Sequence, residues 1–207
     1  MSRLFFALWP DDETRQELGR LSQAIQAAGL KPVNPQNLHV TLVFIGNVDS
    51  AVESLIKQSV ADISVEPFVL TFDQLSYWSR PKVLCLTCKQ DDYTTATDPG
   101  SLPPMEVRSG DSTPRLGEVE QLPRVVHGAV ALAAALDAAV ASCDIQTDKR
   151  PYLPHITLAR HVRHLPDINI KPIVWRAESF CLVESCSEPD GVQYKVIQQW
   201  PLIKLAV

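Results

Sequence analysis

Apolar residues recur along the chain with two periods, and each period predicts one kind of element. Alternating or short continuous apolar runs predict strands at residues 4–9, 38–45, 68–72, 83–87, 155–162, 175–185 and 192–200. Apolar residues at helical spacing predict helices at residues 10–28, 51–63 and 126–141. The order lacks a regular strand–helix–strand alternation, so it favours an α+β fold over a doubly wound one.

One stretch interrupts this pattern. Residues 90–123 are rich in Asp, Thr, Ser, Pro and Gly and hold few large apolar side chains. Such a composition does not supply a core. We expect a flexible surface insertion there, within a chain whose 207 residues suit one domain or two tightly joined lobes.

Composition and charge exclude several classes of protein. Apolar runs fall short of the roughly 18–20 residues that cross a bilayer, and the first residues lack the pattern of a secretory signal. The net charge of −5 gives no support to general coating of RNA. Cys85 and Cys88 form a lone CxxC within a predicted strand, so we expect reduced, mostly buried thiols in a cytoplasmic protein rather than a zinc site.

The strongest signal is a tetrad that occurs twice. His39–Val40–Thr41–Leu42 and His155–Ile156–Thr157–Leu158 both read His-x-Thr-Leu and both lie in predicted strands. Side chains two apart on a strand share a face, about 6.6 Å apart. Each tetrad therefore sets an imidazole beside a hydroxyl, with apolar residues on the opposite face.

Two such pairs facing each other can open a cyclic phosphodiester without a metal. One imidazole takes a proton from water and the other gives a proton to the departing oxygen, because histidine titrates near working pH. The threonine hydroxyls then hydrogen-bond the nonbridging phosphate oxygens. The alternatives are buried structural histidines, or zinc ligands, for which neither tetrad offers a second ligand at i+2 or i+4.

The tetrads and their flanks resemble a known family. The stretches RLFFALWP, NLHVTLVFIG, PKVLCL and RPYLPHITLAR are similar to the 2H phosphoesterase superfamily, and within it to the RNA 2′,3′-cyclic phosphodiesterase (2′-5′ RNA ligase) family. The resemblance implies a bilobal fold over residues 1–207, with two pseudo-symmetric lobes of mainly antiparallel strands, helices outside and a central cleft.

The resemblance also implies roles for particular residues. His39 matches the proton donor, His155 the proton acceptor, and Thr41 and Thr157 the threonines that contact phosphate. The implied activity is hydrolysis of RNA 2′,3′-cyclic phosphate ends to 2′-phosphates, with reversible 2′-5′ ligation. The two tetrads are too similar for the residues themselves to order the roles of donor and acceptor.

Two neighbours are further candidates for substrate binding. Arg160 suits phosphate geometry, but strict alternation places it on the face opposite His155, so this role needs a bulge or twist. Phe44 follows the first tetrad at the same offset and either fills core or stacks on a base. Strict alternation also places His161 on the same strand face as His155. Arg150 either lines the cleft or is an ordinary surface charge.

Two departures from the family pattern bear on substrate. The 90–123 insertion lengthens the segment between the tetrads, and Leu153 stands where relatives often carry a basic residue. Two other functions stay open: a phosphodiesterase for a small cyclic nucleotide, and a noncatalytic RNA-end-binding module. We expect a monomer that needs no cofactor, binds no membrane, and takes RNA with a 2′,3′-cyclic phosphate end or a small nucleotide.

Overall fold

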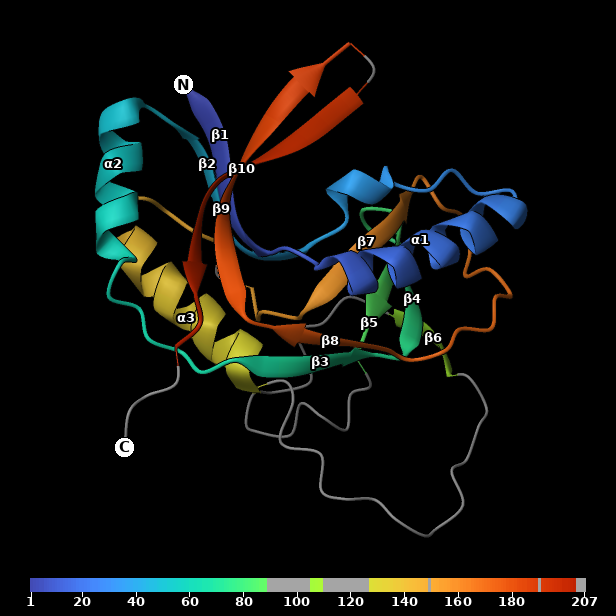
Figure 1. The fold of residues 1–207 in the computed structure, drawn as a ribbon. Helices are drawn as coiled ribbons and strands as arrows, with labels where there is room; N and C mark the ends of the chain where they lie inside the picture. Colours follow the sequence, from blue (N-terminus) through green and yellow to red (C-terminus); the bar gives the residue numbers. More distant parts are fainter. Residues whose placement is uncertain (89–104, 110–126, 149, 190, 204–207) are drawn as a thin grey trace, which may run out of the picture.

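Strands dominate the chain and form one large sheet and one small one (Figure 1). A computed structural model describes residues 1–88, 105–109, 127–148, 150–189 and 191–203. The strands are β1 (Ser2–Leu8), β2 (Val40–Val48), β3 (Phe68–Phe72), β4 (Gln74–Trp78), β5 (Val83–Thr87), β6 (Met105–Ser109), β7 (His155–Arg160), β8 (Ile173–Ala177), β9 (Ser179–Glu188) and β10 (Gly191–Pro201). The helices are α1 (Asp12–Ala27), α2 (Ser50–Ser59) and α3 (His127–Ala141), with a 3₁₀ turn η1 (Pro35–Asn37).

The large sheet consists of two halves that meet at one pair of strands. Its order is β10-β9-β1-β2-β7-β5-β4-β6, and the paired strands run antiparallel. Four strands lie on each side of the β2–β7 junction, where the register joins only Val40 and Ile156. Each half contributes one tetrad to that junction. This arrangement confirms the predicted α+β architecture with two similar antiparallel lobes.

The helices bury one face of the sheet. Helix α3 packs against β2 and β3, α2 packs against α3, and α1 packs against β8 (Figure 1). The main core contains the fully buried side chains of Phe6, Trp175 and Phe180. A second cluster on β1 and β9 contains Phe5, Ala7, Cys181 and Val183. Because side chains alternate along β1, this cluster lies on the sheet face opposite the main core.

Aspartate side chains cap the starts of two helices. Asp11 caps α1 by accepting from the Thr14 amide at 2.7 Å, and Asp49 caps α2. Such side-chain acceptors satisfy amides that have no partner in the first turn. No helix in the described part of the chain is both long enough and apolar enough to cross a membrane.

The elements differ from the sequence expectation at three places. Residues 175–185, predicted as one strand, contain the end of β8 and most of β9, separated at Glu178. Strand β4 was not predicted. Of the expected insertion at 90–123, the structure describes only β6, which pairs with β4 and so adds an edge strand. The rest of that range lies outside the described residues.

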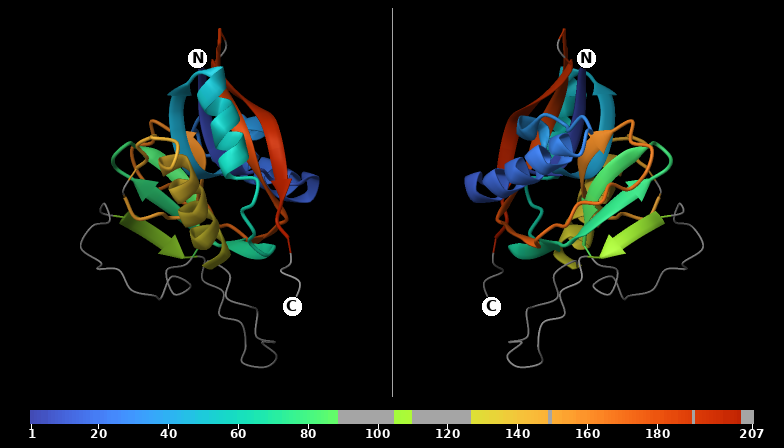
Figure 2. Two further views of the ribbon diagram at one scale, coloured as in Figure 1. Left: turned by 90° about the vertical axis from the view of Figure 1, so that its left-hand side faces the viewer. Right: turned by 90° about the vertical axis from the view of Figure 1, so that its right-hand side faces the viewer.

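A long hairpin formed by β9 and β10 rises beyond the other elements, as the two side views show (Figure 2). Asn37 at the end of η1 connects it to the first tetrad. The Asn37 Nδ2 donates to the Val192 carbonyl at 2.6 Å, and its Oδ1 accepts from the Tyr194 amide at 3.1 Å. Asn37 is buried, so this pair of bonds fixes the backbone just before His39 against β10.

We predict that Asn37→Ala lowers the free energy of unfolding by about 1–3 kcal/mol, because it leaves a backbone donor and acceptor of β10 without their partner. Urea unfolding followed by circular dichroism measures the change. The exposed neighbour Gln36→Ala is the matched control and should shift the midpoint little. Equal midpoints for the two variants would contradict the connecting role of Asn37.

Candidate active site at the junction of the two lobes

The tetrads meet where β2 and β7 pair. Val40 and Ile156 are register partners and both are fully buried, so they point into the core. Their sequence neighbours His39, Thr41, His155 and Thr157 therefore point to the opposite face. The antiparallel sense sets His39 towards Thr157 and Thr41 towards His155. The structure thus brings the four predicted residues together, each partly exposed.

A matching bulge follows each threonine. In β2, Ala7 pairs with Thr41 and Phe6 with Val43, which leaves Leu42 without a partner. Each such extra residue changes which face the following side chains occupy. Consistent with this, Leu42 and Val43 are both buried, at 5% and 6% exposure, and Phe44 is exposed at 58%. Phe44 therefore does not fill core, and it lies beside Phe5, whose ring also contacts His39.

The same irregularity occurs in β7. Cys85 pairs with Thr157 and Leu84 with Ala159, so Leu158 has no partner. Leu158 and Ala159 are both fully buried, and Arg160 is exposed. Strict alternation would place Arg160 on the face opposite His155. The bulge shifts the alternation by one residue and so returns Arg160 to the face of His155. Burial is the main cause that lowers the pKa of His39 and of His155, and the charge of Arg160 adds to it at both imidazoles.

Backbone carbonyls orient both imidazoles in the same way. The Nδ1 of His39 lies 2.6 Å from the Asn37 carbonyl, and the Nδ1 of His155 lies 2.8 Å from the Leu153 carbonyl. A carbonyl only accepts, so each Nδ1 carries a proton and each Nε2 is the reactive nitrogen. The Nε2 of His39 lies 2.9 Å from the Thr41 hydroxyl. Both Nε2 atoms are thus available as proton acceptors.

The surroundings favour neutral imidazoles. Burial lowers the pKa of His39 to about 4, against a weaker raising effect from its bond to the Asn37 carbonyl. Charge on His155 and Arg160 lowers it further. Burial is also the main cause that lowers the pKa of His155. In the free protein at neutral pH, both rings are therefore uncharged.

Aromatic side chains surround the two rings, and sequence patterns alone did not identify them. Trp9 stacks on His39 with centroids 5.9 Å apart and planes 16° apart, and Tyr194 meets the same ring edge-on at 5.1 Å. Trp78 contacts His155 at 4.5 Å. These contacts exclude water from one side of each imidazole, which agrees with the direction of the pKa shifts. The available signal was alternation alone, because Trp9, which directly follows β1, is an even number of residues from Phe5.

Other candidates fall outside this group. His161 is exposed and has a positive φ of 60°, so it does not continue the face of His155. Arg150 is exposed and pairs with Asp148. The cysteines are free thiols, and Cys85 and Cys88 are buried as expected. Among the described residues no group of three or more His, Cys, Asp or Glu is placed to hold a metal.

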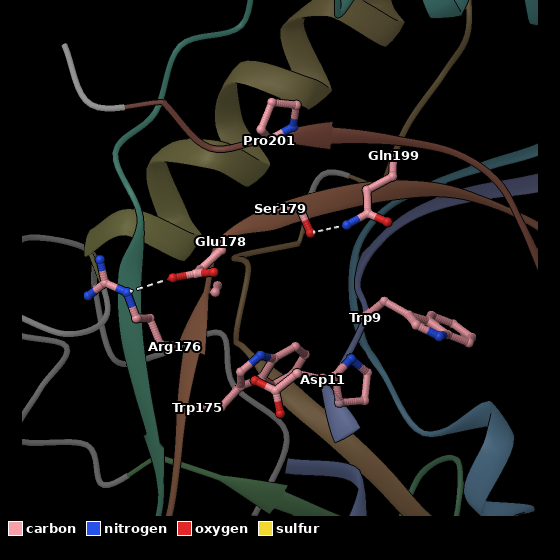
Figure 3. A pocket seen from close by; sticks show the side chains of 10 residues that line it. Trp9, Asp11, Trp175, Arg176, Glu178, Ser179, Gln199 and Pro201 are labelled. Atoms are coloured by element: carbon pink, nitrogen blue, oxygen red, sulfur yellow. Dashed lines mark hydrogen bonds and ion pairs between the residues drawn. The ribbon is translucent and has the colours of Figure 1, made fainter. Parts of the chain in front are cut away.

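A hollow of about 630 Å³ has Trp9 in its lining (Figure 3). Within its lining, Arg176 pairs with Glu178 at 3.1 Å, and the Gln199 amide donates to the Ser179 hydroxyl at 2.6 Å. Neither imidazole lines it. We therefore place the candidate chemistry at the β2–β7 junction, where proton-transferring groups converge.

Comparison with known proteins shows what the chain is similar to. Residues 8–85 match the family model described as LigT like phosphoesterase, a stretch that includes the first tetrad. Proteins named RNA 2′,3′-cyclic phosphodiesterase from Escherichia coli and Thermus thermophilus are 26% and 27% identical to the chain. These alignments cover 97% of this chain in both cases, and 96% and 90% of the relatives. An Archaeoglobus fulgidus protein of the same name is 30% identical over 45% of this chain, which spans 55% of that relative.

The fold agrees with solved structures as well. The structure of Escherichia coli LigT without ligand superposes with a TM-score of 0.72 at 24% identity, covering 98% of each chain. A Thermus thermophilus structure, TT0787, superposes with a TM-score of 0.60 at 23% identity, covering 97% of each. By the match over residues 8–85 and the relatives along nearly its whole length, the chain is similar to LigT-like phosphoesterases, and the superpositions show that it shares their fold.

Proposed function

We propose that the chain hydrolyses 2′,3′-cyclic phosphodiester ends of RNA to 2′-phosphomonoesters. One observation carries the proposal: two imidazoles with identical Nδ1 anchoring meet at one strand junction, each with a threonine beside it. The relatives named RNA 2′,3′-cyclic phosphodiesterase supply the substrate class. Solved structures of Escherichia coli LigT with 3′-AMP and with ATP support binding of a nucleotide at such a fold.

The reaction divides between the two rings. The Nε2 of His155 takes a proton from water as the water oxygen attacks phosphorus. The bond from phosphorus to the ribose O3′ breaks, and the Nε2 of His39 gives its proton to that oxygen. The product carries a 2′-phosphate and a free 3′-hydroxyl. Thr41 and Thr157 donate hydrogen bonds to the nonbridging oxygens, where charge builds in the transition state.

The low pKa of His39 requires substrate to assist the acid. In the free protein the ring is neutral at pH 7, since its pKa lies near 4. A bound phosphodiester carries one negative charge, and an opposite charge within a few ångströms raises the pKa of an imidazole. His39 therefore takes up its proton as substrate binds. A ring of low intrinsic pKa then releases this proton readily to O3′.

The same groups also support ligation. If the 5′-hydroxyl of a second RNA replaces water, His155 takes the proton of this hydroxyl and the product is a 2′-5′ phosphodiester. Arg160 and Phe44 complete the proposed substrate contacts, the guanidinium with phosphate oxygens and the exposed ring with a base.

We predict that His39→Ala and His155→Ala each lower kcat on a 2′,3′-cyclic-ended oligonucleotide by about a hundredfold or more, because each removes one proton transfer. Product is measured by chromatography with EDTA present, and the wild type should keep its rate. Glu188→Ala, at an exposed position of β9 outside the site, is the control. Full activity in either site variant, or loss of wild-type activity in EDTA, would rule out the proposed chemistry.

The acid–base pair also predicts a pH dependence. The profile of kcat/KM reports the free protein, in which the pKa values of both His39 and His155 are lowered. We expect a bell-shaped kcat/KM profile with its maximum below pH 6.5, and a kcat profile displaced to higher pH because bound phosphate raises the pKa of His39. A kcat/KM maximum above pH 7 would contradict the neutral resting state.

Arg160 and Phe44 should affect binding more than chemistry. We predict that Arg160→Gln raises KM about tenfold, in line with the loss of one charge-assisted contact to phosphate. Phe44→Ala should raise KM by a similar factor if a base stacks on the ring. Steady-state kinetics on the cyclic-ended oligonucleotide measure both variants, with the exposed Glu188→Ala as the control. Unchanged KM in both variants would remove these residues from the substrate contacts.

A further inference from the structure

Positive charge gathers beside the candidate site although the chain as a whole is acidic. Residues 30–33, 79–84 and 160–164 contain Lys31, Arg80, Lys82, Arg160 and Arg163, which are five of the 19 Lys and Arg residues. The same three segments contain none of the 24 Asp and Glu residues. All five cations are exposed. We call this group the basic lip.

Backbone contacts bring the three segments together. Pro32 bridges to Ala159, and the Val33 amide donates to the Leu158 carbonyl at 2.7 Å, which sets Lys31 next to Arg160. From the other side, the Val162 amide donates to the Lys82 carbonyl at 3.0 Å. Figure 1 shows the loop after α1, the β4–β5 turn and the end of β7 converging at one place.

The basic lip is continuous with the site. Arg160 belongs to both, since its charge acts on His39 and His155 and its backbone pairs with Val83, the residue after Lys82. Among the described residues, the ion pairs that we find do not involve the five cations of the lip. Lys82 of the lip, and His161 next to Arg160, have positive φ values of 66° and 60°. Lysine rarely adopts such a conformation, whereas histidine is among the residues enriched there.

A row of exposed cations without acids attracts a polyanion, and each phosphate neutralised releases counterions. We propose that the basic lip binds the sugar–phosphate backbone of the single strand whose cyclic end occupies the β2–β7 junction. This inference rests on the proposed function and adds to it a preference for an RNA strand over a free cyclic nucleotide. It also explains how a chain of net negative charge binds RNA, because the cations of the lip lie together beside the site.

The test compares strand lengths. Wild-type protein should give a higher kcat/KM on a 2′,3′-cyclic-ended hexanucleotide than on 2′,3′-cyclic AMP, and this advantage should fall as salt rises. In the lip variant Lys31→Gln/Arg80→Gln/Arg163→Gln, the ratio of kcat/KM on the hexanucleotide to kcat/KM on 2′,3′-cyclic AMP should fall by about tenfold. Turnover of 2′,3′-cyclic AMP should be unchanged, because the lost phosphate contacts weaken binding of the strand alone. The variant keeps Arg160 and avoids the strained Lys82.

A charge-matched control separates the lip from net charge. Arg20→Gln/Lys171→Gln/Lys195→Gln removes three exposed cations from other elements and should keep the wild-type advantage. An equal loss in both variants would overturn the inference, as would an unchanged length dependence in the lip variant.

Equilibrium binding keeps the lip testable if the proposed function itself fails. Fluorescence anisotropy with a labelled single-stranded hexanucleotide that ends in a 2′-phosphate measures affinity over a range of salt. Each phosphate contact removed should reduce the slope of log affinity against log salt by about 0.7. Inactivity towards every cyclic phosphate with a reduced slope would reject the chemistry and keep the lip. Activity on 2′,3′-cyclic AMP with an unchanged slope in the lip variant would keep the chemistry and reject the lip.

Discussion

The site depends on one short strand contact. Strands β2 and β7 join the two halves of the large sheet through Val40 and Ile156, whose buried side chains anchor the junction from the core side. Because alternation sends the flanking residues to the other face, this one contact sets both imidazoles and both threonine hydroxyls on the same surface. Nothing mobile is needed to assemble the group, and rigid elements hold catalytic geometry better than loops do.

Each half of the large sheet holds its tetrad by the same local geometry. A carbonyl two residues earlier fixes the Nδ1 of each histidine, and a bulge one residue after each threonine returns the later side chain to the site. The halves differ in what that later side chain is: Phe44 in one and Arg160 in the other. A pseudo-symmetric frame thus presents an apolar contact on one side and a cation on the other, which suits a nucleotide with a base and a phosphate.

Sequence reasoning predicted the tetrads, their shared face and the mixed α+β class, since these follow from period-two alternation and element order. It could state that a role for Arg160 needs a bulge or twist, but it could not locate the bulges, because alternation assumes one residue per register position. The signal was nevertheless present as two adjacent buried apolar residues, Leu42–Val43 and Leu158–Ala159. The stacking of Trp9 on His39 and the convergence of the basic lip depend on tertiary contacts between distant segments. Net charge alone could not reveal that local concentration of cations.

The central claim is that both imidazoles act on one phosphate, and a crystal structure with the 2′-phosphate product of a cyclic-ended oligonucleotide tests it most directly. The account predicts phosphate oxygens within about 3.2 Å of the Nε2 atoms of both His39 and His155. A phosphate bound at only one ring, or bound in the hollow lined by Trp9 and Trp175, would contradict it.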